Sequence, residues 1–248
     1  ILLEKGTILG SSHLAVIAGV GKAKVRVSKM PTVALIVTGS ELVEVHESPE
    51  RGKIRDTNSI QLRSLVEKMN LVCNFYGVVE DDYKVLLSIF QKAAAENDMV
   101  IFTGGAAVGD FDLVPKMIEN EGFEVLWTRT GLKPGNPMSF ARKDQRYVFG
   151  LSGNPVSSFV QFEYLAKPVL YRLLGADFRP TRLKARVKSA ISRKNGSRLG
   201  IIPVKIIEGE VEVLRFNGSG HANALPGADA LMEFPEGQLT IEEGEQMY

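Results

Sequence analysis

The 248-residue sequence contains little cysteine, little histidine and no long apolar run. Its single cysteine, Cys73, cannot form an internal disulfide, which is typical of a reducing compartment. The three histidines lack the spacing of metal ligands, so we predict no zinc site. No apolar stretch approaches the roughly 18 residues that a membrane span needs, and no signal peptide is visible. These absences predict a soluble, cytoplasmic protein without a membrane partner.

Strong charge of one sign is also missing, because the net charge is only +1. Such a balance provides no general attraction to nucleic acid or to anionic lipid. Basic residues do gather after residue 177, but no aromatic side chains for base stacking are interleaved with them. We interpret this stretch as a solvated strand face and predict no nucleic-acid partner. Its members are Arg179, Arg182, Lys184, Arg186, Lys188, Arg193, Lys194, Arg198 and Lys205.

From residue 30 onward, apolar strands alternate with helical patterns. Residues 33–37 and 99–102 are typical of strands buried on both faces, and residues 154–174 are typical of an apolar helix. The alternation predicts an α/β fold, a three-layer sandwich in which helices cover both faces of a mostly parallel sheet. A small C-terminal β-domain is expected to have strands at residues 182–188, 199–207, 211–216 and 239–241.

We divide the chain into three parts. Residues 1–29 form a lead-in segment with a short helix and an exposed strand over residues 25–27, and they are too few to bury a core. Because the chain begins at Ile1 instead of methionine, we interpret this segment as the remnant of an N-terminal region. Residues 30–177 form the α/β domain, and residues 178–248 form the C-terminal β-domain.

Two glycine-bearing turns each lead from an apolar strand into a helix. The first contains Gly104 and Gly105, and the second contains Ser152 and Gly153. Glycine has no Cβ, so backbone N–H groups at a helix N-terminus can approach an anion closely. In parallel sheets, ligands bind beyond the carboxyl ends of the strands. The two turns therefore predict a site for a phosphate-bearing small molecule at that edge.

Acidic residues lie in three loops that we expect at the same edge, namely Glu41, Asp82 and Asp112. Three carboxylates would repel a phosphate unless a divalent cation lay between them, and Mg²⁺ prefers such oxygen ligands. Asp82 and Asp112 could each instead be a helix N-cap, which is a common role of aspartate. We favour function for the trio as a whole: Glu41 and Asp112 in catalysis or metal positioning, and Asp82 in contact with the metal or the substrate.

A lysine and a helix start add further polar groups. Lys133, in the Gly131–Gly135 loop, is the expected counter-charge for phosphate or another oxyanion, although loop lysines are more often merely solvated. Asn154 and Pro155 suit the first positions of a helix, which leaves the Ser157 hydroxyl and nearby N–H groups for an oxyanion. An ordinary capped helix explains these residues equally well.

A series of motifs in one order resembles the molybdopterin molybdenumtransferase family, which includes the C-terminal part of gephyrin. The motifs are Thr38–Leu42, Ile54–Ser59, Gly77–Asp82, the two glycine turns and Lys133–Pro137. The resemblance implies an enzyme that inserts molybdenum from molybdate into adenylylated molybdopterin and releases AMP. It also implies Mg²⁺ as cofactor and a homodimer.

With the resemblance included, we assign Asp112, Glu41 and Lys133 to catalysis, and Asp82, Glu41 and Asp112 to the metal. Arg198 enters through the resemblance alone, because it matches a family arginine near the ligand. The residues assigned to substrate binding are Gly104, Gly105, Asp110, Asn136, Ser152, Gly153, Asn154, Pro155, Ser157 and Arg198.

Four positions depart from the family pattern: Ser40 replaces aspartate, Ala107 serine, Asn136 lysine and Ser152 proline. Asn136 matters most, since losing one charge-assisted contact weakens anion binding about ten- to a hundredfold. These departures leave open an alternative, a non-catalytic pterin-binding, nucleotide-binding or scaffold module of the same fold. An adenylyltransferase acting one step earlier is disfavoured by the Gly153–Pro155 turn and the appended β-domain.

Overall fold

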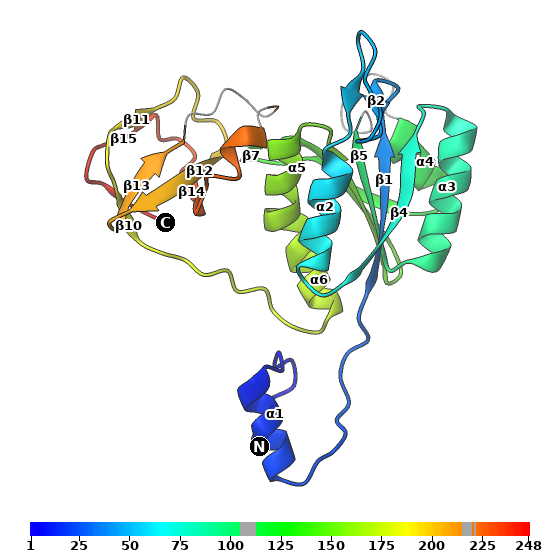
Figure 1. Cartoon of the computed structure of the whole chain (residues 1–248), viewed down its shortest axis with the longest axis horizontal. Helices are drawn as coiled ribbons and strands as arrows, with labels where there is room; N and C mark the ends of the chain where they lie inside the picture. The colour runs from blue at the N-terminus through cyan, green and yellow to red at the C-terminus, as the bar shows by residue number, and fades with distance from the viewer. Residues whose placement is uncertain (105–112, 215–219, 221) are drawn as a thin grey trace.

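The computed structural model describes residues 1–104, 113–214, 220 and 222–248. Its centre is a six-stranded sheet in the order β4-β1-β5-β9-β8-β6 (Figure 1). The first four of these strands run parallel, β8 is antiparallel to β9, and β6 is antiparallel to β8. The strand bounds are Thr32–Thr38 (β1), Val72–Val79 (β4), Met99–Gly104 (β5), Glu124–Arg129 (β6), Pro137–Lys143 (β8) and Arg146–Ser152 (β9).

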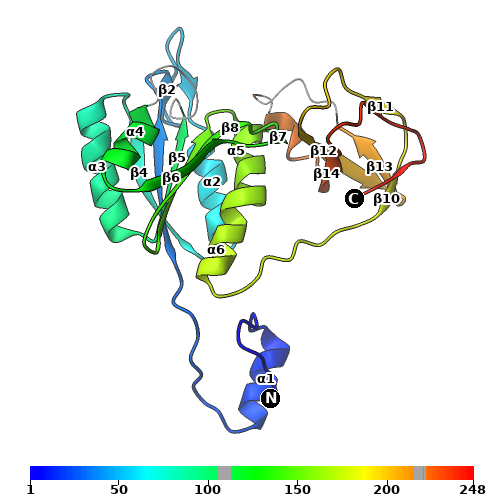
Figure 2. The same cartoon turned by 180° about the vertical axis from the view of Figure 1, so that it is seen from behind.

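Helices cover both faces of this sheet, as Figures 1 and 2 show from opposite sides. Val33 and Leu35 of β1 pack with helix α2, the turn Phe162–Ala166 and helix α6 on one face, whereas Ala34 and Ile36 pack with α3 and α4 on the other. Both faces of β1 are therefore buried, which confirms the three-layer α/β sandwich. The helices are α2 (Asn58–Glu67), α3 (Tyr83–Glu96), α4 (Leu113–Asn120), α5 (Pro155–Gln161) and α6 (Lys167–Leu173).

The expected apolar helix over residues 154–174 is continuous. A π-helical turn, Phe162–Ala166, connects α5 to α6. Phe162, Ala166 and Leu170 are fully buried on this helix and belong to the core shared with β1 and β5. The long apolar run therefore serves as the main covering element of one sheet face.

The carboxyl ends of the four parallel strands meet at one edge of the sheet. Strand register places Thr38 beside both Val79 and Gly104, and Gly104 beside Ser152. Above β1, strands β2 (Leu42–Val43) and β3 (Ile54–Arg55) pair into a small flap within a segment that we expected to be a loop. We call this edge the rim.

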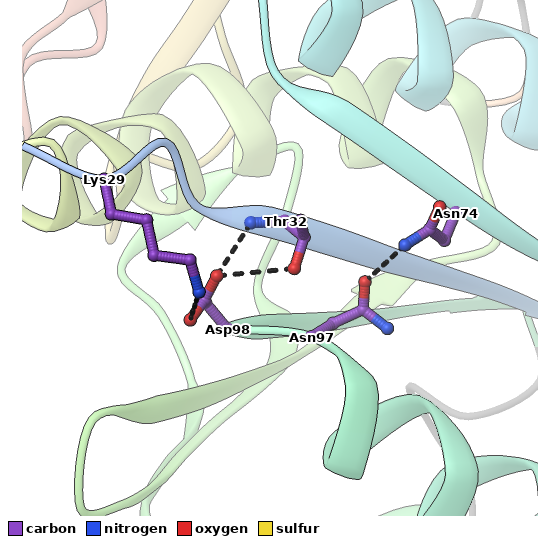
Figure 3. A network of polar contacts seen from close by, with 5 residues as sticks. All are labelled: Lys29, Thr32, Asn74, Asn97 and Asp98. Carbon is purple, nitrogen blue, oxygen red and sulfur yellow. Dashed lines mark hydrogen bonds and ion pairs between the residues drawn. The ribbon is translucent and has the colours of Figure 1, made fainter.

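The opposite edge of the sheet is closed by a network of polar side chains (Figure 3). Asp98 Oδ2 accepts a hydrogen bond from the Thr32 N–H at 2.9 Å, and its Oδ1 lies 4.0 Å from Lys29 Nζ. Asn74 Nδ2 donates to Asn97 Oδ1 at 2.8 Å. These contacts tie the amino ends of β1, β4 and β5 to one another.

The C-terminal β-domain packs against α5. Leu132, Val160 and Ile201 form the buried contact between the two parts, and β7 (Leu132–Lys133) pairs in parallel with β12. The expected β-domain is present, but β11, β14 and β16 were not predicted. Its strands are β10 (Ala185–Val187), β11 (Ile191–Ser192), β12 (Leu199–Ile207), β13 (Glu210–Val213), β14 (Ala230–Phe234), β15 (Thr240–Ile241) and β16 (Gln246–Met247).

The lead-in segment contains the expected short helix, α1 (Ser11–Gly19), which buries none of its residues. The strand expected over residues 25–27 is wrong: these residues are exposed, and no described strand pairs with them. Alternation of apolar and polar residues makes a strand only where a partner edge accepts its hydrogen bonds. Across the described ranges, no helix is long and apolar enough to cross a membrane.

Gly104→Ala tests the packing at the rim. Gly104 has φ +124°, and an added Cβ would overlap the carbonyl oxygen of Thr38. We expect urea unfolding to show a loss of about 3 kcal/mol or more in the free energy of unfolding. Gly131→Ala is the control, since an added Cβ there meets nothing within 4 Å. Equal stabilities of the two variants would contradict the packing argument.

Candidate functional site

The two glycine turns lie directly against each other at the rim. Ser152 is the register partner of Gly104. A Cβ on Gly153 would lie 3.2 Å from Gly104 Cα, so the turns approach more closely than larger residues allow. The glycines therefore have a packing role in addition to the anion access that the sequence suggested.

Buried side chains hold the second turn from behind. Thr103 Oγ1 donates to the Ser152 carbonyl oxygen at 3.0 Å. Asn58 Nδ2 donates to Thr103 Oγ1 at 2.9 Å and to the Gly153 carbonyl oxygen at 2.8 Å. Asn58 and Thr103 were not assigned from the sequence, although Asn58 lies in one of the motifs. With their carbonyl oxygens occupied, Ser152 and Gly153 are fixed in orientation.

Helix α5 begins at this turn. Asn154 precedes it and Pro155 is its first residue, but within the described part of the chain the Asn154 side chain makes no capping hydrogen bond. The Asn154 N–H instead donates to Ser152 Oγ at 3.2 Å. A Cβ on Gly220 of the β-domain would lie 3.9 Å from Asn154 Oδ1. The positive end of α5 and its buried Ser157 thus lie in a corner that both domains form.

The Lys133 loop folds back on itself beside this corner. Thr130 Oγ1 donates to the Gly135 carbonyl oxygen at 2.7 Å, and the Thr130 N–H donates to the Asn136 carbonyl oxygen at 2.8 Å. Lys133 is exposed and Asn136 is half-buried. The loop therefore has a fixed backbone, and it carries Lys133 at the surface.

Gln161 joins the Lys133 loop to the second glycine turn. Its Oε1 accepts a hydrogen bond from the Ser152 N–H at 2.8 Å. Its Nε2 donates to the carbonyl oxygens of Gly135 and Pro137 at 3.0 and 2.7 Å. The structure thus brings together Gly104, the Ser152–Ser157 segment and the loop carrying Lys133 and Asn136.

Arg198 lies where the β-domain meets the Lys133 loop. The N–H of Leu199, the next residue, donates to the Gly131 carbonyl oxygen at 2.9 Å. Arg193 has a different environment from the solvated face that we expected for the basic stretch. It lies 4.2 Å from the centre of the Phe234 ring and donates to the Arg198 carbonyl oxygen at 2.8 Å. Arg193 therefore holds the segment that carries Arg198.

The acidic residues Asp82 and Glu41 have different surroundings in the structure. Asp82 is the N-cap of α3, and its Oδ1 accepts hydrogen bonds from the N–H groups of Lys84 and Val85 at 2.9 and 3.0 Å. Glu41 is exposed in the turn after β1. Among the described residues, no group of three His, Cys, Asp or Glu side chains could hold a metal ion. Asp112, Asp110 and Gly105 lie outside the described residues, so the three-acid site stays a prediction.

The described residues form two hollows of interest. One of about 370 Å³ lies beneath the β2–β3 flap, where Lys53 Nζ donates to the Ser40 carbonyl oxygen and Glu80 forms part of the wall. The other, of about 620 Å³, lies between the β-domain and the α5–α6 helix and is lined by Tyr164, Phe178 and Met232 among others. None of the assigned site residues that the structure describes lines either hollow.

Groups with shifted pKa values lie away from the rim. Burial raises the pKa of the Cys73 thiol to about 11, which keeps it protonated and a poor nucleophile at neutral pH. Burial, and then the neighbouring Glu233 carboxylate, raise the pKa of Tyr164 above its usual range.

The sequence matches two described protein families. Residues 34–172 match a probable molybdopterin binding domain, and residues 184–247 match the MoeA C-terminal region, domain IV. Curated molybdopterin molybdenumtransferases of Staphylococcus epidermidis and Staphylococcus aureus are 35% and 34% identical over 248 residues. That alignment covers 98% of this chain but 59% of each relative, so the chain spans about three fifths of their length.

Solved structures agree with these matches. The molybdopterin biosynthesis MoeA protein of Pyrococcus horikoshii superposes with a TM-score of 0.81 at 32% identity, over 100% of this chain and 60% of that one. A molybdenum cofactor biosynthesis protein of Pyrococcus furiosus gives a TM-score of 0.74 at 28% identity, over 99% of this chain and 78% of that one. Both likenesses include the α/β domain and the β-domain together.

Asn58→Ala tests the network behind the second glycine turn. The substitution removes two hydrogen bonds and leaves the Gly153 carbonyl oxygen and the buried Thr103 hydroxyl without the Asn58 donor. We expect the free energy of unfolding to fall by about 2–3 kcal/mol in urea titrations. Asn120→Ala removes only an exposed contact at 3.4 Å and should change it by less than about 0.5 kcal/mol. Equal free energies of unfolding for the two variants would contradict a stabilising role of the network.

Proposed function

The chain belongs to the molybdopterin molybdenumtransferase family, and on that basis we propose that it inserts molybdenum into the molybdenum cofactor. The substrates are molybdate and adenylylated molybdopterin. Molybdenum becomes bound to the two dithiolene sulfurs of the pterin, and one oxide of molybdate leaves as water with the two thiol protons. A second water molecule cleaves the phosphoanhydride bond between AMP and the phosphate of the pterin, so that AMP is released. Because the chain spans only part of its curated relatives, this activity is proposed for the protein that contains it.

The observation that carries the proposal is the convergence of separate segments at the rim. Gly104 and Ser152 are register partners, and Gln161 connects Ser152 to the Lys133 loop. Residues far apart in the sequence are thereby linked at the rim, where we expect their N–H groups and the Lys133 cation to face one small volume. A ligand with phosphate and oxyanion groups fits such a volume better than an apolar ligand would.

Each segment has a distinct role in this proposal. The N-terminus of α5, with the Ser157 hydroxyl, binds the phosphate of the adenylylated pterin through uncommitted N–H groups and the helix dipole. Lys133 supplies positive charge to phosphate or molybdate, and Arg198 adds charge from the β-domain side. The Gly104 and Gly153 turns allow the ligand to approach the backbone.

We also propose Mg²⁺ as a cofactor of this site. Proteins commonly hold Mg²⁺ through one or two carboxylates together with substrate phosphates, so a three-acid cluster is not required. Glu41 and Asp82 follow the neighbouring strands β1 and β4 and offer the oxygen ligands that Mg²⁺ prefers. When bound, Mg²⁺ would neutralise charge on the phosphate oxygens. Asp112 is the third proposed ligand.

A homodimer completes the proposal. Helix α1 buries none of its residues, and Leu14 and Val16 on it are 53% and 41% exposed. Apolar side chains in that state favour contact with another protein surface. We propose that the neighbouring subunit covers them and completes the cleft.

The direct test is AMP release. Protein incubated with adenylylated molybdopterin and Mg²⁺ should release AMP, measured by chromatography, only after molybdate is added. Lys133→Met should weaken apparent pterin affinity about ten- to a hundredfold through loss of a charge-assisted contact. Lys68→Met, an exposed substitution at the end of α2, should not. Tight pterin binding without AMP release would contradict the proposed reaction and support a non-catalytic binding module.

Asn136→Lys tests the departure from the family pattern. A lysine in this loop would add a charge-assisted contact, so molybdate should bind about tenfold more tightly by calorimetry. The free energy of unfolding should stay nearly constant, since the backbone of Asn136 and not its side chain closes the loop. Unchanged molybdate affinity would count against an anion at this loop.

A further inference from the structure

Gln161 is a fully buried amide in the last turn of α5. Burying an amide costs free energy unless its donors and acceptor are satisfied. Here all of them are used, because Oε1 accepts from the Ser152 N–H and Nε2 donates to the carbonyl oxygens of Gly135 and Pro137. The side chain thus makes a three-point bridge between two loops.

The pairing of β8 with β9 stops short of those two loops. Strands β8 and β9 are paired from Lys143–Arg146 up to Ser139–Gly150, where the register ends. Beyond that pair the chain continues to Ser152 on one side and back to Gly135 on the other, and Gln161 is the side chain that joins them. Gly135 also packs on it, since an added Cβ there would lie 3.1 Å from Gln161 Cγ.

We propose that Gln161 is a positioning residue that sets the separation between the Ser152 turn and the Lys133 loop. Through this spacing, the N-terminus of α5 and the cation of Lys133 face the same anion. The inference rests on the proposed function, because it takes the anion at the rim to be the phosphate of an adenylylated ligand. Gln161 itself does not contact the ligand.

The amide is the chemical group that this bridge needs. A carboxylate at the same place would still accept from the Ser152 N–H, but it would repel the carbonyl oxygens of Gly135 and Pro137. Burial and those carbonyl dipoles would raise the pKa of the new carboxyl group. Gln161→Glu should therefore lose the link to the Lys133 loop at high pH and regain one donor when the pH is lowered.

Asn97 provides a matched control. It is 4% exposed, and its Nδ2 donates to the Ala93 carbonyl oxygen and to the Tyr76 hydroxyl at 2.9 and 3.0 Å. Asn97 lies in the network at the opposite edge of the sheet (Figure 3). Asn97→Asp makes the same amide-to-carboxylate change in a buried bridge that has no link to the rim.

The test measures AMP affinity with Mg²⁺ by calorimetry for the unsubstituted protein and its variants, alongside urea unfolding. Gln161→Glu should weaken AMP binding at least about tenfold near pH 8 and recover near pH 5.5. Gln161→Met, which keeps the volume without charge, should weaken it similarly at both pH values. Asn97→Asp should lower stability but leave affinity within about twofold.

Each remaining outcome overturns a stated claim. If the Gln161 variants fold and bind AMP as tightly as the unsubstituted protein, the positioning role is wrong and the proposed function stands. If both Gln161 variants fail to fold, or if Asn97→Asp weakens AMP binding equally, Gln161 is only structural. If the unsubstituted protein binds neither AMP nor molybdate, the proposed function and this inference fall together.

Discussion

The rim depends on the close approach of two backbone turns. Gly104 has a positive φ and lies beneath the Thr38 carbonyl oxygen, and Gly153 packs against its Cα. Side chains at these positions would push β1, β5 and β9 apart at the edge where their carboxyl ends meet. Because glycine occupies both turns, the strand ends stay in register and the start of α5 lies beside them. The same absence of Cβ atoms exposes the backbone to a ligand.

The polar groups at the two edges of the sheet have different roles. At the amino edge, Asp98, Asn97 and their partners satisfy one another and close the surface. At the rim, the buried side chains of Thr103 and Asn58 donate hydrogen bonds to the carbonyl oxygens of the second glycine turn. The buried Gln161 side chain donates to a carbonyl oxygen of the Lys133 loop. The N–H groups at the start of α5 lack a side-chain cap among the described residues, and Lys133 is exposed. An anion is the ligand that complements this arrangement.

Patterns in the sequence predicted the features that depend on residues close together in the chain, such as buried strands and helix caps. Residues 33–37 are apolar throughout because both faces of β1 are buried, and Asp82 caps a helix as its residue type favours. The motif order also identified the family. The roles of Asn58 and Gln161 could not be predicted, since each depends on partners that only the tertiary fold brings near. The expected strand at residues 25–27 failed for the same reason, because a partner edge is a property of the fold.

A crystal structure with adenylylated molybdopterin and Mg²⁺ bound would test the convergence at the rim most directly. We expect the ligand's phosphate between the N-terminus of α5 and the Lys133 loop, with the ligand in contact with the backbone of the Gly153 turn. A phosphate bound instead beneath the β2–β3 flap, or in the hollow lined by Tyr164, would contradict this account.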